Sequence, residues 1–376
     1  ANTSGANNIG IGFGAAKTTT TGIANVAVGG NALKLNETGC YNIAIGKDTM
    51  EANTTGCYNV AVGYLALDAN TTAHNNTAVG DASLSANTTG YINVAIGKNA
   101  MLANTTGQGN VGIGGYALDA NTTGARNVAI GCSAMSANTT CSDNVGIGFC
   151  ALATQVDGGI NNTSVGAYSM KLNTLGDNNV AIGMHALCTN TEGVTNTAIG
   201  SCALEDNTTA SSNVAVGASA LSNNTTGTAN VSVGPFSMND STTGSNNIAI
   251  GCNSLDASTE GDKNTAVGSL SLTNTTGDCN VGIGYSGGSL TTTGDNNTAL
   301  GYNAQPSSNS VSDEFTLGNG AHDNLRCNDT SISSLSDERD KENIEDIPHG
   351  LDYILALRPV KFDWNRRDGT AAGKKD

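Results

Sequence analysis

Acidic side chains are the first residues to consider for chemistry, because hydrolysis of a polysaccharide needs two carboxylates that face each other across a cleft. Asp68, Asp119 and Glu205 stand at polar corners of the chain, but no pair of carboxylates recurs at a fixed spacing. The four histidines lie far apart in the sequence, and the ten cysteines show no metal-binding spacing such as C-x2-C. We therefore predict no polysaccharide-cleaving site, no metal site and no cofactor along most of the chain.

The composition of the 376 residues is not that of a typical globular protein. Aromatic residues make up 4% and charged residues 13% of the chain, whereas a globular domain contains about 25% charged residues. With so few large side chains the sequence cannot fill a thick core. Its apolar residues are small or aliphatic and evenly spaced, which is typical of a thin solenoid.

Charge and hydropathy argue against two kinds of partner. The net charge is -16, whereas binding to a nucleic-acid backbone requires clustered Lys and Arg. No stretch approaches the roughly 20 apolar residues that are needed to cross a bilayer. We therefore expect no nucleic-acid partner and no membrane insertion.

A five-residue motif organises the chain. It consists of Asn, a Val, Ile or Thr, a small residue, an aliphatic residue and Gly, and eighteen copies occur between Asn8 and Gly301. The step between copies is 17 residues, apart from one step of 18 and one of 16. So regular a period predicts that each repeat forms one coil of a β-solenoid. Four of the copies are Asn25 to Gly29, Asn42 to Gly46, Asn59 to Gly63 and Asn93 to Gly97.

Within each repeat the pattern predicts a short strand. If the Asn is position 0, large aliphatic or β-branched residues at positions 1 and 3 alternate with a small residue at position 2. The Gly at position 4 is expected to end the strand in a conformation open mainly to Gly. Ala-Leu or Ala-Met at positions 7 and 8 fits a second short strand or extended segment. A polar corner such as Asn121–Gly124 then closes the coil.

Successive coils should stack by parallel strand pairing about 4.8 Å apart, so that eighteen coils make a rod roughly 85 Å long. We expect positions 1 and 3 to meet the Leu or Met of position 8 inside the coil, and position 2 to face outward as a flat stripe of small residues. If the faces are reversed, an outward stripe of Val and Ile demands burial equally. Either arrangement predicts side-by-side association of identical rods with closed cyclic symmetry.

The Asn at position 0 allows two interpretations. Its amide can bond to the next coil and form a ladder, as stacked Asn residues do in cross-β arrays. Alternatively, it can contact a ligand or a glycan. We favour the ladder.

The repeat resembles the left-handed parallel β-roll of trimeric autotransporter adhesin heads, whose signature includes a V-A-I-G run. That run occurs here as Val94–Gly97 and Val128–Gly131. In this chain the Asn directly precedes the Val, whereas the adhesin motif places one residue between them. Similar repeats also occur in phage tail fibres. The resemblance covers the repeat region and concerns its architecture more than its biological role.

The repeat pattern fails from Asn303 onward. We therefore divide the chain into a β-roll shaft (residues 1–305), a linker or neck (306–330) and a C-terminal segment (331–376). The neck contains a predicted last strand near Glu314–Asn319. Charged residues crowd into the C-terminal segment, where the spacing of apolar residues predicts a short helix and then a strand, so we expect a small α+β unit.

The C-terminal segment resembles the start of the intramolecular chaperone domain of phage tail spikes and fibres, the endosialidase-type self-cleaving peptidase. The resemblance rests mainly on Ser331–Ile344 and on Leu357–Phe362. It implies a trimeric fold that aligns three fibre chains in register and then releases itself. It also implies a Ser-Lys dyad at Ser336 and Lys341, with cleavage between Leu335 and Ser336.

The chemistry of such a dyad is reasonable. A Ser hydroxyl is a weak nucleophile until a base removes its proton, and a Lys can be that base when desolvation lowers its pKa. Attack of Ser336 on the carbonyl that precedes it would be an acyl shift without a separate substrate pocket. In the alternative interpretation, Ser336 caps a turn and Lys341 is a solvated charge.

Together these features predict a structural and adhesive rod, namely the distal part of a bacteriophage tail fibre. We expect an extracellular homotrimer that binds a host-surface receptor of glycan type. Residues 1–5 read as the end of a preceding repeat, so we also expect an upstream connection to other tail proteins of the virion. The alternative is the head of a bacterial surface adhesin, which would require a coiled-coil stalk and a membrane anchor downstream.

Overall fold

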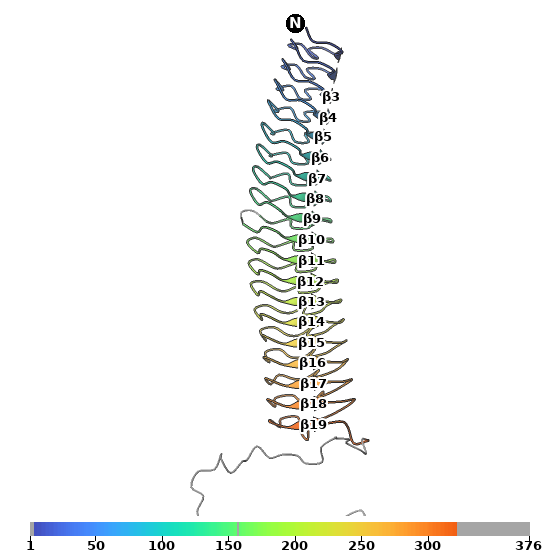
Figure 1. The fold of residues 1–376 in the computed structure, drawn as a ribbon, viewed down its shortest axis with the longest axis vertical. Helices are drawn as coiled ribbons and strands as arrows, with labels where there is room; N and C mark the ends of the chain where they lie inside the picture. The colour runs from blue at the N-terminus through green and yellow to red at the C-terminus, as the bar shows by residue number, and fades with distance from the viewer. Residues whose placement is uncertain (1–3, 156–157, 322–376) are drawn as a thin grey trace, which may run out of the picture. The chain divides into compact units, whose positions relative to one another are not determined.

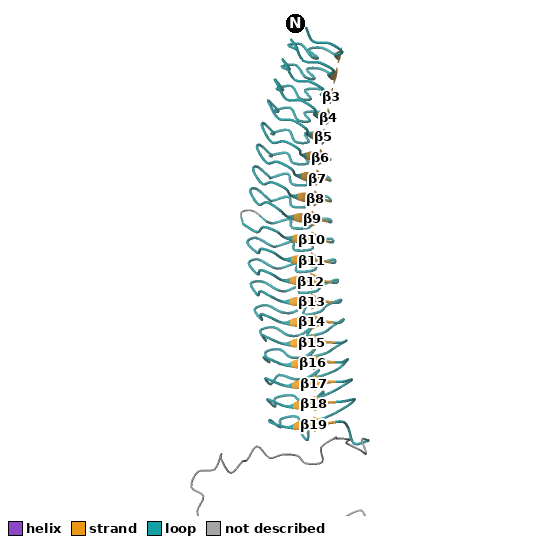
Figure 2. Cartoon of the chain, in the orientation of Figure 1, coloured by secondary structure: helices purple, strands orange, loops and turns teal. Residues whose placement is uncertain are grey.

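The computed structural model describes residues 4–155 and 158–321 (Figure 1). Within these residues the chain winds into a column of coils in which short strands alternate with turns, and no helix is present (Figure 2). Accordingly, no helix in the described ranges is long and apolar enough to cross a membrane. The predicted all-β parallel solenoid with a 17-residue period is confirmed.

Nineteen strands of three residues each form one parallel sheet, in which every strand pairs with the next strand along the chain. They occupy positions 1 to 3 of the coils. In chain order they are β1 (Ile9–Ile11), β2 (Val26–Val28), β3 (Ile43–Ile45), β4 (Val60–Val62), β5 (Thr77–Val79), β6 (Val94–Ile96), β7 (Val111–Ile113), β8 (Val128–Ile130), β9 (Val145–Ile147), β10 (Thr163–Val165), β11 (Val180–Ile182), β12 (Thr197–Ile199), β13 (Val214–Val216), β14 (Val231–Val233), β15 (Ile248–Ile250), β16 (Thr265–Val267), β17 (Val281–Ile283), β18 (Thr298–Leu300) and β19 (Phe315–Leu317).

The strands keep their register where the repeat length changes. Val145 of β9 pairs with Thr163 of β10 across the 18-residue step, and Thr265 of β16 pairs with Val281 of β17 across the 16-residue step. Both changes of length fall in the polar corner that precedes the next Asn. The strand predicted near Glu314–Asn319 is β19, which pairs with β18 and extends the same sheet.

The expected orientation of the strand faces is wrong, and the reverse arrangement is observed. The small residue at position 2 points inward, and so do positions 7 and 8: Ala129, Ala134 and Met135 are all 0% exposed. The residues at positions 1 and 3 point outward, as in Val128 and Ile130 of β8, which are only partly buried. The interior of a 17-residue coil is too narrow for β-branched residues on one wall and Leu or Met on the other. A small residue on the strand wall leaves room for the larger one.

The second short strand or extended segment predicted around positions 7 and 8 is also wrong, because this segment consists of turns. Tyr116 and Leu118 adopt left-handed φ angles of 59° and 52°. Their N–H groups donate in opposite directions along the column, from Tyr116 to the oxygen of Lys98 and from Leu118 to the oxygen of Ala134, each over 3.0 Å. Left-handed residues cost about 1–3 kcal/mol each, and these bonds to both neighbouring coils offset that cost.

The predicted amide ladder is present at position 0. The N–H of Asn127 donates to Oδ1 of Asn110 over 2.9 Å, and Oδ1 of Asn127 accepts from the N–H of Asn144 over 3.1 Å. Nδ2 of Asn127 donates to the oxygen of Cys141 over 2.8 Å. Each of these residues therefore ties its own coil to both neighbours, through its backbone N–H on one side and its side-chain oxygen on the other.

A second ladder, which the sequence analysis did not single out, runs along position 11. Nδ2 of Asn121 donates to Oδ1 of Asn104 in the preceding coil over 2.8 Å and to the oxygen of Gly124 in its own corner over 3.1 Å. The polar corners are thus fastened from inside, and their recurring Asn residues are structural.

The Gly at position 4 behaves as predicted. Its φ is 133° in Gly29, 138° in Gly46, 142° in Gly63 and 134° in Gly97, in a region that side chains rarely adopt. A Cβ on Gly46 would also lie 2.3 Å from the carbonyl oxygen of Gly63 in the next coil. Any other residue at this position would therefore force adjacent coils apart.

We predict that Asn127→Ala destabilises the rod by about 1–3 kcal/mol, because it leaves the buried N–H of Asn144 without its acceptor. Thr123→Ala, at an exposed corner one coil away, should change stability by less than about 0.5 kcal/mol. Denaturant unfolding followed by circular dichroism would compare the midpoints. Equal midpoints for the two variants would show that the ladder does not stabilise the column.

Candidate functional site

The outward side of the sheet is the largest candidate functional surface. It consists of positions 1 and 3 of β1 to β19, which we call the strand face. Every one of these residues is Val, Ile, Leu, Phe or Thr, and none is charged. Ile43 and Ile45 of β3 are 38% and 40% exposed, and Ile248 and Ile250 of β15 are 39% and 41% exposed. The same chemistry therefore extends along the whole described column.

A surface of this kind is not expected on an isolated rod. Exposed apolar patches on monomers seldom exceed a few hundred Å², and larger ones mark interaction sites. At about 4.8 Å per strand, the nineteen strands make an apolar stripe roughly 90 Å long. Both changes of repeat length fall in corners, so the stripe continues without a step and can match a second copy coil by coil.

The Asn residues of the repeat are buried, which decides between their two interpretations. Asn25 is 1% exposed, and Asn42, Asn59 and Asn93 are 0% exposed. Their amides bond to neighbouring coils, so they cannot contact a ligand or a glycan. These Asn residues therefore build the scaffold and do not form a binding site.

The predicted dyad of Ser336 and Lys341 and the cleavage point after Leu335 lie outside the described residues. The same holds for the rest of the segment 331–376, including its predicted helix. These assignments remain predictions from the sequence.

The acidic residues considered at the outset have different surroundings. Asp68 and Asp119 occupy position 9, where burial raises the pKa of each carboxyl group despite opposing hydrogen bonds from backbone N–H groups. Oδ1 of each is buried and has no hydrogen-bond partner among the described residues. Glu205 is instead close to a histidine, since its Oε1 lies 3.3 Å from Nδ1 of His185. No sequence motif pairs this carboxylate with this imidazole, and the fold brings them together.

The structure also assembles a cluster that sequence reasoning missed. The rings of Phe149 and Tyr168 meet edge to face with their centroids 5.2 Å apart, and Tyr168 and His185 follow at 5.2 Å. Nζ of Lys171 lies 5.3 Å from the centroid of the Tyr168 ring. Writing the repeats one above another would have revealed the cluster, because its rings come from positions 5 and 6 of three consecutive coils.

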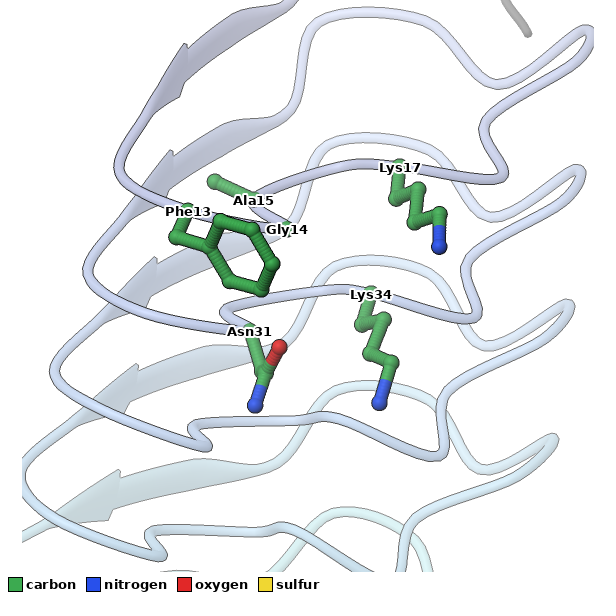
Figure 3. Close-up of a pocket in the computed structure, with 6 residues that line it drawn as sticks. All are labelled: Phe13, Gly14, Ala15, Lys17, Asn31 and Lys34. Carbon is green, nitrogen blue, oxygen red and sulfur yellow. The ribbon is translucent and has the colours of Figure 1, made fainter.

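One open pocket of about 620 Å³ lies beside the first coils of the described region (Figure 3). Phe13, which is 90% exposed, forms one side of it, and Lys17 and Lys34 from successive coils form the other. Nζ of Lys34 also pairs with Oε1 of Glu51 over 2.6 Å. The pocket combines an aromatic ring, two ammonium groups and the amide of Asn31.

Comparison with known families identifies the C-terminal segment. Residues 336–375 match the Peptidase_S74 family model, the chaperone of endosialidase. This confirms the resemblance inferred from the sequence, and the match begins at Ser336. No curated protein is significantly similar to the chain. A parallel β-solenoid followed by an endosialidase chaperone has the organisation of a phage tail-fibre-like structural protein.

The raised pKa of Asp119 predicts a pH-dependent contribution to stability. Above its folded pKa, Asp119 is charged in both the folded and the unfolded state, and the burial of that charge destabilises the fold. Stability is gained as the pH falls through the folded pKa toward the ordinary value of 3.8, and is lost again as the pH rises.

Asp119→Asn should therefore stabilise the rod at pH 7, and the advantage over the wild type should shrink as the pH falls toward that ordinary value. Thermal melts of both proteins between pH 7 and acidic pH would test this. A variant that is less stable at pH 7, or a difference that does not change with pH, would contradict the prediction.

Proposed function

We propose that this chain forms the shaft and the maturation segment of a homotrimeric phage tail fibre, which attaches the virion to its host. The observation that carries the proposal is the uncharged strand face, which runs the length of a rod whose C-terminal segment matches a fibre chaperone. A rod of this kind needs partners of equal length, and identical copies supply them.

In the proposed trimer, the strand faces of three chains turn toward a common axis. Burial of Val, Ile and Leu side chains contributes roughly 25 cal/mol for each Å² of apolar surface removed from water, and the pairing of each coil with its counterpart repeats this gain along the rod. Closed three-fold symmetry prevents further sideways growth. The number three is supported by the chaperone match, because the resemblance implies a trimeric chaperone.

The chaperone has a clear physical task in such a fibre. The coils are nearly identical, so two chains can pair out of register by one coil at little cost in apolar contact. A C-terminal segment that trimerises first would fix the register before the strand faces meet. Removal of that segment afterwards would leave the aligned shaft in place.

The trimeric shaft would act as a stiff spacer that also carries receptor contacts, with its upstream end joined to other virion tail proteins. Each contact with a host glycan can be weak, because three copies on one fibre increase the effective affinity. The fibre would then work outside the host cell, as a structural and adhesive component of the virion.

Ile130→Glu should break the proposed trimer, because it places a carboxylate in the middle of an interface without charges. Thr123→Glu is the matched control, since it adds the same charge at an exposed corner of the preceding coil. Sedimentation velocity should give three times the mass of the shaft chain seen on a denaturing gel for the wild type and the control, and a smaller mass for Ile130→Glu. A monomeric wild type would refute the trimer.

We also propose that Ser336, with Lys341 as its base, cleaves the chain after Leu335. The Ser336 hydroxyl attacks the Leu335 carbonyl, the acyl group moves from the Ser336 nitrogen to its oxygen, and water then hydrolyses the resulting ester. Ser336→Ala should leave the chain intact, whereas the neighbouring control Ser334→Ala should be processed normally. Denaturing gels and intact-mass spectrometry would follow the products, and the released fragment should begin at Ser336. Normal processing of Ser336→Ala, or the absence of processing in the wild type, would exclude this mechanism.

A further inference from the structure

A second surface of the rod lies away from the strand face. It is built from positions 5, 6 and 9, which follow each strand. Midway along the described column it carries the ring cluster of Phe149, Tyr168 and His185, which we call the aromatic platform. These residues follow β9, β10 and β11, so the platform spans three consecutive coils. Phe149 is 47% exposed, and Met184, which precedes His185 in the chain, is 54% exposed.

Polar groups of both kinds surround the platform. Nζ of Lys171 lies 5.3 Å from the centroid of the Tyr168 ring and supplies hydrogen-bond donors. Oε1 of Glu205 lies 3.3 Å from Nδ1 of His185, which fixes the imidazole and directs its Nε2 away from the carboxylate. Apolar ring faces beside a few oriented donors and acceptors are the usual lining of small-molecule sites.

The same layout occurs a second time on this surface. In the first coils, Phe13 occupies position 5, and Lys17 and Lys34 occupy position 9, around the open pocket (Figure 3). In the platform, Phe149 occupies position 5 and Lys171 occupies position 9. An aromatic ring combined with a Lys from position 9 therefore recurs in a chain that is only 4% aromatic and 13% charged. This recurrence indicates that the pocket beside Phe13 and the platform bind the same kind of ligand.

We propose that the aromatic platform is a saccharide-binding site of the fibre, an inference that rests on the proposed function in attachment. The apolar face of a pyranose ring packs on Tyr168 and Phe149, whose negative ring faces attract its C–H groups. The sugar hydroxyls bond to Lys171, to His185 and to the carboxylate of Glu205. The pocket beside Phe13 is a second subsite of the same type.

The chemistry favours a saccharide over a protein partner. The platform is small, and Lys171 and Glu205 lie beside its rings, whereas a protein hot spot is enclosed by a wider apolar contact. The platform also lies outside the strand face, so a trimer leaves all three copies accessible. Three such sites at one level of the fibre give a much higher effective affinity than one site alone, so weak binding of each sugar is enough for attachment.

Tyr168→Ala tests the proposal, with Tyr58→Ala as its matched control. Tyr58 is a ring that contacts another ring, as Tyr168 does, being 58% exposed and stacked on Tyr41 with a centroid distance of 5.1 Å, but it precedes a strand and lies outside the platform. Labelled full-length proteins would be applied to an array of purified bacterial surface polysaccharides. We expect the wild type and Tyr58→Ala to bind the same saccharides, and Tyr168→Ala to bind them at least about tenfold more weakly.

His185→Ala is a second variant in case Tyr168→Ala does not fold, and it should weaken binding to the same saccharides. Sedimentation velocity on each protein separates this inference from the proposed function. Saccharide binding at the platform would be refuted by a trimeric wild type that binds no saccharide on the array. It would also be refuted if folded Tyr168→Ala or His185→Ala bound saccharides as tightly as the wild type. Neither result would contradict the trimeric fibre. A wild type that is not trimeric would overturn the fibre itself.

Discussion

Hydrogen bonds parallel to the rod axis are the interaction on which the rest of the structure depends. Each coil has strands of only three residues and a thin interior of Ala with Leu or Met, so it could not stand alone. Its backbone groups and its buried amides find their partners in the coils before and after it. Asn127 shows this well, because its backbone N–H bonds to the preceding coil and its side-chain oxygen bonds to the next one. Stability is therefore a property of the stack.

This constraint explains two features that look costly in isolation. Non-Gly residues such as Leu118 adopt left-handed backbone conformations because this turns their N–H groups along the axis. Gly46 and its equivalents pack so closely on the next coil that no side chain fits between them. Both costs recur in most coils, and both are offset by bonds that also recur. Outside the strand face, the chain can thus vary its outer residues while its inner residues repeat.

The narrow interior also determines what the surface presents. Because only small residues fit on the strand wall, the β-branched residues of each strand must face outward, and they build an uncharged stripe along the rod. Variable residues at positions 5, 6 and 9 form another surface of the rod. The proposed division of labour follows from this geometry, with one surface for assembly and another for recognition of a ligand.

The sequence alone determined the architecture. The 17-residue period fixed the number and order of the coils, the Gly at position 4 marked the strand ends, and the C-terminal motif led to the endosialidase chaperone. These conclusions depend on local patterns, which repetition makes easy to read. The sequence did not determine the direction of the strand face, since alternation gives a period of two residues but not which side is inside. The widths of opposing side chains decide that, and they meet only in the folded coil.

The repeat pattern shows which distant residues lie on adjacent coils, but only the tertiary structure decided which of their side chains touch. His185 and Glu205 are isolated in the sequence, and Phe149 and Tyr168 are separated by the single lengthened repeat. The column places each pair in contact because residues about one lap apart lie on adjacent coils. The contact between Phe149 and Tyr168 also requires the strands to keep their register across the lengthened repeat, and the hydrogen bonds between coils settle that, not any local pattern in the chain.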